Sequence, residues 1–187
     1  MTLTIKTKKE DVLKLAPACT CDKCEVGCHY GSGAFVKGQL EPLAKFLNMS
    51  LEELKEKYLE EIEKFNTKLY RPKLIKKKGI KELFGLRENK PHGRCIFFDD
   101  DKKCTIHQVK PLECQVASGC SGHGDATIAW FDFHYYFNKH DPESVRQYTS
   151  YIQNGGRVIQ GADLDSLFPT KEEKEKLKKI LDYAIVK

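Results

Sequence analysis

The chain has 187 residues, of which 40% are hydrophobic and 32% charged, so it has the size and composition of one globular domain. A chain of this length buries about 70% of its unfolded surface, which excludes extensive disorder and any need for disulfides to replace a missing core. The 32 Lys and Arg residues exceed the 27 Asp and Glu residues by only five. No run of 18 apolar residues and no apolar leader is visible, so we expect a cytoplasmic protein without a membrane partner.

Helical patterns account for most of the chain. Residues 1–18 form a short lead-in. A short helix is predicted near Pro42, and a longer one is opened by the capping box of Ser50 and Glu53. Apolar residues at helical spacing extend this second helix to Phe65; they are Leu51, Leu54, Tyr58, Leu59, Ile62 and Phe65.

The C-terminal part, 126–187, is also predicted to be helical. The aromatic stretch 128–137 fits a helix or a strand, and we favour the helix. Asp141-Pro142 opens the next helix by N-cap and N1 proline, and Asn154-Gly155-Gly156 ends it. A last helix is expected from Thr170.

All eight cysteines fall into two windows, on segments rich in Gly, Asp, Lys and His. The first is Cys19-x-Cys21-x2-Cys24-x3-Cys28, and the second is Cys95-x8-Cys104-x9-Cys114-x5-Cys120. Structural cysteines usually stand singly at apolar positions of regular elements, and disulfides are rare in a reducing compartment. We therefore predict that all eight thiolates ligate metal, with disulfides as the weaker alternative.

The identity of the metal stays open from spacing alone. Cys21-x2-Cys24 is a knuckle that tetrahedral Zn²⁺ uses, but the second window has no matching pair. Three thiolates at Cys21, Cys24 and Cys28 also suit a cubane iron–sulfur cluster that takes its fourth ligand from a distant segment of the chain. We favour one or two iron–sulfur clusters, 4Fe–4S in type, with Zn²⁺ as the alternative.

The cysteine pattern resembles the YkgJ-like family, whose domain is described as a zinc- or iron-chelating CxxCxxCC domain. The resemblance rests on Cys21-x2-Cys24 with Cys28, on Cys95-Ile-Phe-Phe, on Cys104-Thr-Ile-His107 and on Lys110-Pro-Leu-Glu-Cys114. It covers the stretch from Cys19 to Cys120 and implies metal binding more strongly than any reaction. Gly27 stands where the family has the first cysteine of a pair. Cys19 and Cys120 lie outside the usual pattern.

The predicted fold is mainly α: a single compact helical domain with two irregular cysteine-rich metal-binding loops, at 19–33 and 93–124. At most a short hairpin is expected, with strands at 96–98 and 105–106 around the polar turn 99–103. Three histidines are further candidate ligands, namely His29, His107 and His123. Gly31-Ser32-Gly33 is read as a turn rather than a phosphate site.

Function is predicted as metal binding, for electron transfer or for contact with an unknown protein or redox partner. Two alternatives remain, a zinc-stabilised interaction module and a redox or group-transfer enzyme with an open-site cluster. The basic run 71–81 allows a nucleic-acid partner but lacks aromatic residues for base stacking.

Overall fold

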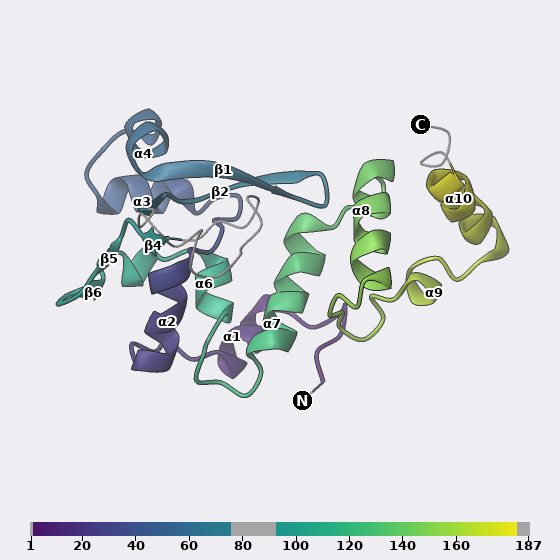
Figure 1. Ribbon diagram of the computed structural model, residues 1–187, viewed down its shortest axis with the longest axis horizontal. Helices are drawn as coiled ribbons and strands as arrows, with labels where there is room; N and C mark the ends of the chain where they lie inside the picture. The colour runs from purple at the N-terminus through teal and green to yellow at the C-terminus, as the bar shows by residue number, and fades with distance from the viewer. Residues whose placement is uncertain (1, 76–92, 183–187) are drawn as a thin grey trace, which may run out of the picture. The chain divides into compact units, whose positions relative to one another are not determined.

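The computed structural model describes residues 2–75 and 93–182 (Figure 1). The chain forms two compact units. The cysteine unit comprises residues 13–62 and 69–124, and the C-terminal unit comprises residues 1–12, 63–68 and 125–187. A single domain stays a prediction. Among the described helices, none is long and apolar enough to cross a membrane.

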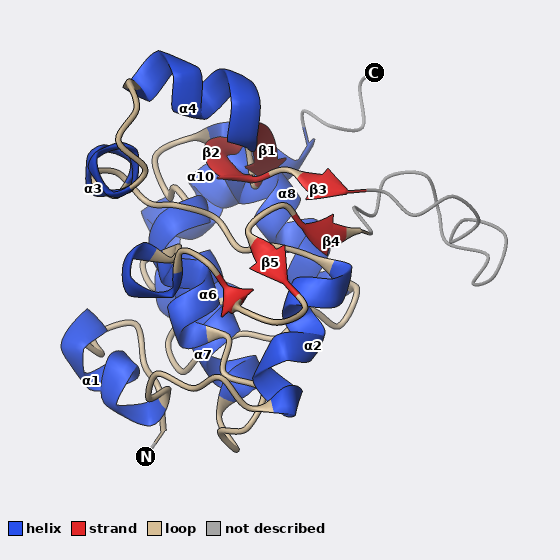
Figure 2. Cartoon of the chain, turned by 90° about the vertical axis from the view of Figure 1, so that its left-hand side faces the viewer, coloured by secondary structure: helices blue, strands red, loops and turns tan. Residues whose placement is uncertain are grey.

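Short helices, two-residue strands and most of a longer hairpin make up the cysteine unit (Figure 2). Helix α1 (Lys9–Leu15) begins in the other unit and ends in this one. The elements that follow are α2 (Asp22–Tyr30), α3 (Leu40–Phe46), α4 (Leu51–Tyr58), β3 (Leu74–Ile75), β4 (Arg94–Cys95), β5 (Phe98–Asp99), β6 (Lys103–Cys104), the 3-10 turn η1 (His107–Val109) and α6 (Leu112–Val116). A buried apolar cluster that includes Phe35, Leu43, Leu54, Phe97 and Ile106 forms its core.

The helix predicted to run from Ser50 to Phe65 is half as long as expected. Its capping box is confirmed, because the Ser50 hydroxyl accepts from the Glu53 amide and the Glu53 carboxylate accepts from the Ser50 amide. The helix ends at Tyr58, and the chain continues as strand β1 (Leu59–Lys64), which pairs with β2 (Thr67–Pro72). Phe65 and Asn66 join the strands with φ values of 48° and 57°, the conformation of a type I′ hairpin turn. The sequence Leu-Glu-Glu-Ile-Glu-Lys of this strand has its apolar residues three apart, which is a helical spacing, so the strand could not be predicted from periodicity.

Neither cysteine window is the irregular loop that we expected. Helix α2 covers most of the first window and carries Cys24 and Cys28. The second window contains β4, the β5–β6 hairpin and α6. Three two-stranded sheets lie in the described residues, against the single hairpin predicted. The mainly α class holds, but five of the eight cysteines lie on helices or strands, namely Cys24, Cys28, Cys95, Cys104 and Cys114.

Helices also build the C-terminal unit. They are α7 (Gly124–Phe131), the π-helix η2 (Asp132–Tyr136), α8 (Pro142–Gln153), α9 (Leu164–Leu167) and α10 (Lys171–Asp182). The helical prediction for 128–137 is confirmed. So are the caps of two predicted helices, since Asp141 accepts from the Glu143 amide and the Thr170 hydroxyl accepts from the Glu173 amide.

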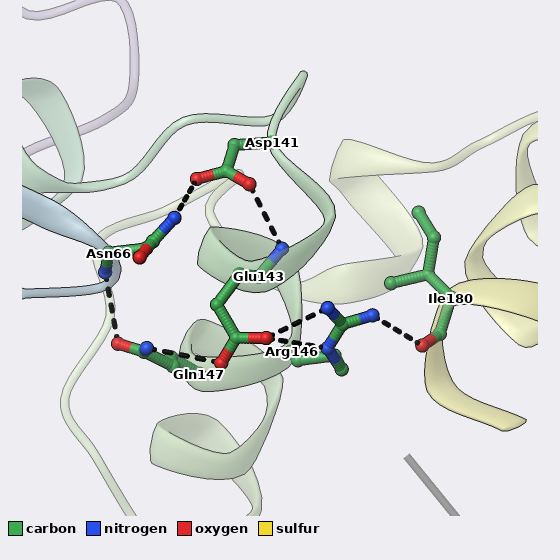
Figure 3. Close-up of polar contacts among 6 residues, drawn as sticks. All are labelled: Asn66, Asp141, Glu143, Arg146, Gln147 and Ile180. Carbon is green, nitrogen blue, oxygen red and sulfur yellow. Dashed lines mark hydrogen bonds and ion pairs between the residues drawn. The ribbon is translucent and has the colours of Figure 1, made fainter. Parts of the chain in front are cut away.

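Polar side chains tie helix α8 to the turn between β1 and β2 and to α10 (Figure 3). The side-chain amide of Asn66 donates to Asp141 at 2.7 Å, and its backbone amide donates to Gln147 at 3.0 Å. Arg146 donates to the Ile180 carbonyl at 3.2 Å and pairs with Glu143 at 2.8 Å. Hydrogen bonds thus supplement apolar packing around α8.

Candidate metal centre

Four cysteines converge at one end of helix α2. The sulfur atoms of Cys19, Cys21, Cys24 and Cys120 all lie within 4.8 Å of one another, and we call these residues the outer quartet. The sulfurs of Cys24 and Cys120 are 3.5 Å apart. All eight cysteines of the chain are free thiols, so the disulfide alternative finds no support in the structure.

Helix geometry brings two of these thiols together. Cys21 is the N-cap of α2, and Cys24 follows in the first turn, with its amide bonded to the Cys21 carbonyl at 2.8 Å. Cys19 accepts from the Cys21 amide at 3.4 Å and completes the N-terminal part of the quartet. The Cys-x2-Cys spacing therefore aims neighbouring thiols into one site.

Cys120 reaches the quartet because Gly119 packs directly on the backbone of α2. A Cβ atom at Gly119 would lie 2.3 Å from the Lys23 carbonyl oxygen and 2.9 Å from the Lys23 carbonyl carbon. Such a contact is too short for any side chain, so only glycine permits this approach. Gly119 thereby positions the fourth thiol of the quartet, although no motif in the sequence marks it.

The outer quartet favours negative charge on Cys24. Burial alone would raise the pKa of this thiol. Hydrogen bonds from the Cys120 amide, the Ser118 hydroxyl and the neighbouring thiols outweigh burial and lower the pKa to about 6. One thiolate is thus available at neutral pH to begin binding a cation.

Ser118 is a second residue that the sequence motifs did not reveal. Its side chain is buried, with 5% of the residue exposed, and its hydroxyl lies 3.4 Å from the Cys120 sulfur and 3.7 Å from the Cys24 sulfur. A thiolate can only accept, so the hydroxyl donates to sulfur once the quartet is ionised. Its proximity to Cys120 in the sequence was the only available signal.

The other four cysteines lie deeper in the same unit, and we call them the inner quartet. They come from four elements: Cys28 from α2, Cys95 from β4, Cys104 from β6 and Cys114 from α6. Burial raises the pKa of Cys28 to about 11 and that of Cys95 to about 12, and the charges of neighbouring thiols add to both shifts. Burial also raises the pKa values of Cys104 and Cys114.

The three histidines named above do not join the outer quartet. His29 packs edge-on against Phe98, with ring centroids 4.6 Å apart. His107 lies 3.5 Å from the Lys110 ammonium, and the His123 amide donates to Ser121. In the basic run, residues 76–81 lie outside the described residues, and Arg71 forms an ion pair with Glu60 at 2.6 Å.

Four close thiols on helical and loop segments define a class of thiolate-rich metal-chelating domains. The family model described as "CxxCxxCC: Putative zinc- or iron-chelating domain" matches residues 20–132, which is more than half of the chain. The chain belongs to this family, as its cysteine pattern predicted. No solved structure matches it.

Proposed function

We propose that the protein is a metalloprotein whose outer quartet binds one thiophilic metal ion through four thiolates. The observation that carries this proposal is the convergence of the four sulfurs within 4.8 Å. A tetrahedral ion with metal–sulfur bonds of about 2.3 Å holds its ligands about 3.8 Å apart. The 3.5 Å separation of Cys24 and Cys120 is close to this value, so little movement would complete the site.

This spacing favours a single ion, Zn²⁺ or mononuclear iron, over a cubane at the outer quartet. In a 4Fe–4S cluster each cysteine binds a different iron, so the ligand sulfurs stand around the cluster rather than around one ion. The iron–sulfur assignment remains a second candidate for the chain. The Gly33 amide, which donates to the Cys114 sulfur at 3.1 Å, supports it at the inner quartet, because amide–sulfur hydrogen bonds are typical of cluster sites.

A quartet with all four positions filled by protein supports a structural, interaction or electron-transfer role over catalysis. Catalytic metal sites usually keep one position open for water or substrate, whereas structural sites have four protein ligands. Cys19 and Cys120, which lie outside the family pattern, supply the third and fourth thiols of the quartet. An enzyme would need a substrate to replace one of them. A protein or redox partner is therefore the expected partner class.

Metal and acid-labile sulfide analysis of anaerobically purified protein tests the proposal. We expect metal in the wild type and one equivalent less in Cys24→Ser, with Ser121→Ala as a matched control that removes a nearby hydroxyl. Zinc without sulfide would identify a single-ion site, and brown protein with sulfide would identify a cluster. Full metal content in Cys24→Ser, or a metal-free wild type, would contradict the proposal.

A further inference from the structure

We infer that Cys24 and Cys120 are the oxidation-sensitive pair of the outer quartet, and that a hydroperoxide converts them to one intramolecular disulfide. Both cysteines are free thiols in the structure, so the disulfide is a product of oxidation. The inference goes beyond the proposed function, because the reaction needs only two free thiols and no bound metal. It begins from a contact between two sulfurs whose residues stand 96 positions apart in the sequence.

The two sulfurs are already in contact. The Cys24 and Cys120 sulfurs lie 3.5 Å apart, whereas the sulfurs of a disulfide lie about 2.05 Å apart. An approach of about 1.5 Å therefore closes the bond. Cysteine side chains turn between staggered positions about the Cα–Cβ bond, so side-chain rotation can supply this approach.

The backbone segments that carry these sulfurs also lie close together. Gly119 precedes Cys120 and packs on helix α2. A Cβ atom at Gly119 would lie 2.3 Å from the Lys23 carbonyl oxygen and 3.4 Å from the Cys24 backbone nitrogen. Disulfides form without strain where the two Cα atoms are about 4.4–6.8 Å apart, so they require segments in close contact. The packing of Gly119 on α2 meets this requirement without any rearrangement of the helix.

A small peroxide can reach this pair from solvent. Cys120 is exposed and Cys24 is partly exposed, whereas Cys95 in the core is only 8% exposed. The Ser118 hydroxyl lies 3.4 Å from the Cys120 sulfur and 3.7 Å from the Cys24 sulfur, so it can donate a hydrogen bond to either one when ionised. Oxidation of cysteine follows exposure and thiolate character, so this pair should react before Cys95.

The reaction uses one hydroperoxide as its oxidant. One thiol of the pair attacks the peroxide, the O–O bond breaks, and a sulfenic acid forms together with an alcohol, or with water where the oxidant is hydrogen peroxide. The second thiol then attacks the sulfenic sulfur. The S–S bond forms, the S–O bond breaks, and water leaves with the proton of the second thiol. Two electrons thus pass from the two sulfurs to the peroxide bond.

The other two thiols of the outer quartet are the competing partners. Cys19 and Cys21 lie within 4.8 Å of the pair, and Cys21 and Cys24 have the Cys-x2-Cys spacing of disulfide oxidoreductases. We favour the long-range pair of Cys24 and Cys120, because its sulfurs are in direct contact and Gly119 holds the two segments together.

Oxidation would also disable the outer quartet, and this consequence rests on the proposed function. An ion held by the four thiolates would lose two of them to the disulfide, so that only Cys19 and Cys21 remain. Structural sites of this kind use four ligands, so the ion should be released. Reduction of the disulfide should restore the site.

Disulfide mapping of the full-length wild type tests the inference. Reduced, metal-free protein is treated with hydrogen peroxide, the remaining thiols are blocked with N-ethylmaleimide, and unreduced peptides are identified by mass spectrometry. We expect the crosslink between Cys24 and Cys120 to be about 10-fold more abundant than any other, because access decides which thiols pair. Dithiothreitol should reverse it. Cys120→Ser should lose this crosslink, and Cys19→Ser should retain it.

Three results would overturn the inference. They are a crosslink between Cys21 and Cys24 as the main product, a crosslink between two molecules, and oxidation of Cys24 and Cys120 to sulfinic acids without a disulfide.

A second sample, loaded with Zn²⁺ before peroxide treatment, tests the proposed function separately. Zn²⁺ has no redox chemistry, so any oxidation falls on sulfur, and a colorimetric chelator reports the released ion. Release of one equivalent as the crosslink forms supports both proposals. The crosslink in a wild type that binds no zinc would support the inference and contradict the proposed function. Zinc that stays bound after the crosslink has formed would contradict the four-thiolate site.

Discussion

Replacement of Gly119 by alanine should disable the outer quartet without touching a ligand. The added Cβ atom would lie 2.3 Å from the Lys23 carbonyl oxygen, whereas ordinary van der Waals contacts begin at 3.4 Å. The neighbouring atoms belong to the backbone of α2 and cannot rotate away. The loop that carries Cys120 must therefore withdraw by about 1 Å, which exceeds the roughly 0.2 Å tolerance of metal–ligand bonds.

This displacement sets the size of the expected effect. Loss of support for one ligand typically lowers metal affinity 10- to 100-fold, equivalent to about 1.4–2.8 kcal/mol. Overpacking costs about 1–3 kcal/mol of stability. We expect Gly119→Ala to weaken metal binding at the outer quartet by at least about 10-fold.

Competition between the protein and a colorimetric chelator for Co²⁺ measures the effect. Gly122→Ala is the matched control, because a Cβ atom at Gly122 meets nothing within 4 Å in the same loop. The control should bind metal as the wild type does. Wild-type affinity in Gly119→Ala would refute the argument that close packing on Lys23 positions Cys120.

Three further predictions concern a hydroxyl, a buried acid and a helix cap. Ser118→Ala should lower the metal affinity of the outer quartet about 10-fold or more in the same competition assay, because the thiolates lose a hydrogen-bond donor. Ser118→Thr should restore the affinity. Wild-type affinity in Ser118→Ala would contradict a role for the hydroxyl in metal binding. Burial raises the pKa of Asp132 despite its 2.6 Å ion pair with Lys64, so the folded state holds a proton that the unfolded state has released. The free energy of unfolding should therefore fall as pH rises from the unfolded pKa of Asp132 through its folded pKa. In urea unfolding, the Asp132→Asn variant should lack this fall. A variant with the same pH profile as the wild type would exclude Asp132 as the cause of the fall. Ser50→Ala should cost about 1 kcal/mol in thermal or urea unfolding through loss of the N-cap of α4, and no change would show that the cap contributes nothing.

Much of the helical structure could be predicted from local signals. Caps at Ser50, Asp141 and Thr170 are side chains that satisfy free amides, so they mark helix starts wherever the helix packs. The end of α4 could not be predicted in this way. The apolar residues of Leu59–Lys64 are three apart, which fits a helix, and the pairing with β2 across the turn at Asn66 overrides this local preference.

The identity of the candidate ligands was visible in the sequence, but their grouping was not. Cys21 and Cys24 are close in sequence and meet through helix geometry, whereas Cys120 reaches them only by tertiary packing. The same holds for Cys114, whose sulfur lies against Gly33 some 81 residues earlier in the chain. Contacts of this range depend on the whole unit, which spacing alone does not encode.

X-ray absorption spectroscopy of the purified metal-loaded protein shows most clearly whether the outer quartet holds a single metal ion. The outer quartet should give four sulfur neighbours at about 2.3 Å around a single ion. A first shell of four sulfurs without a metal–metal distance is the predicted result. A first shell of oxygen or nitrogen, or a short metal–metal distance, would contradict a single ion held by Cys19, Cys21, Cys24 and Cys120.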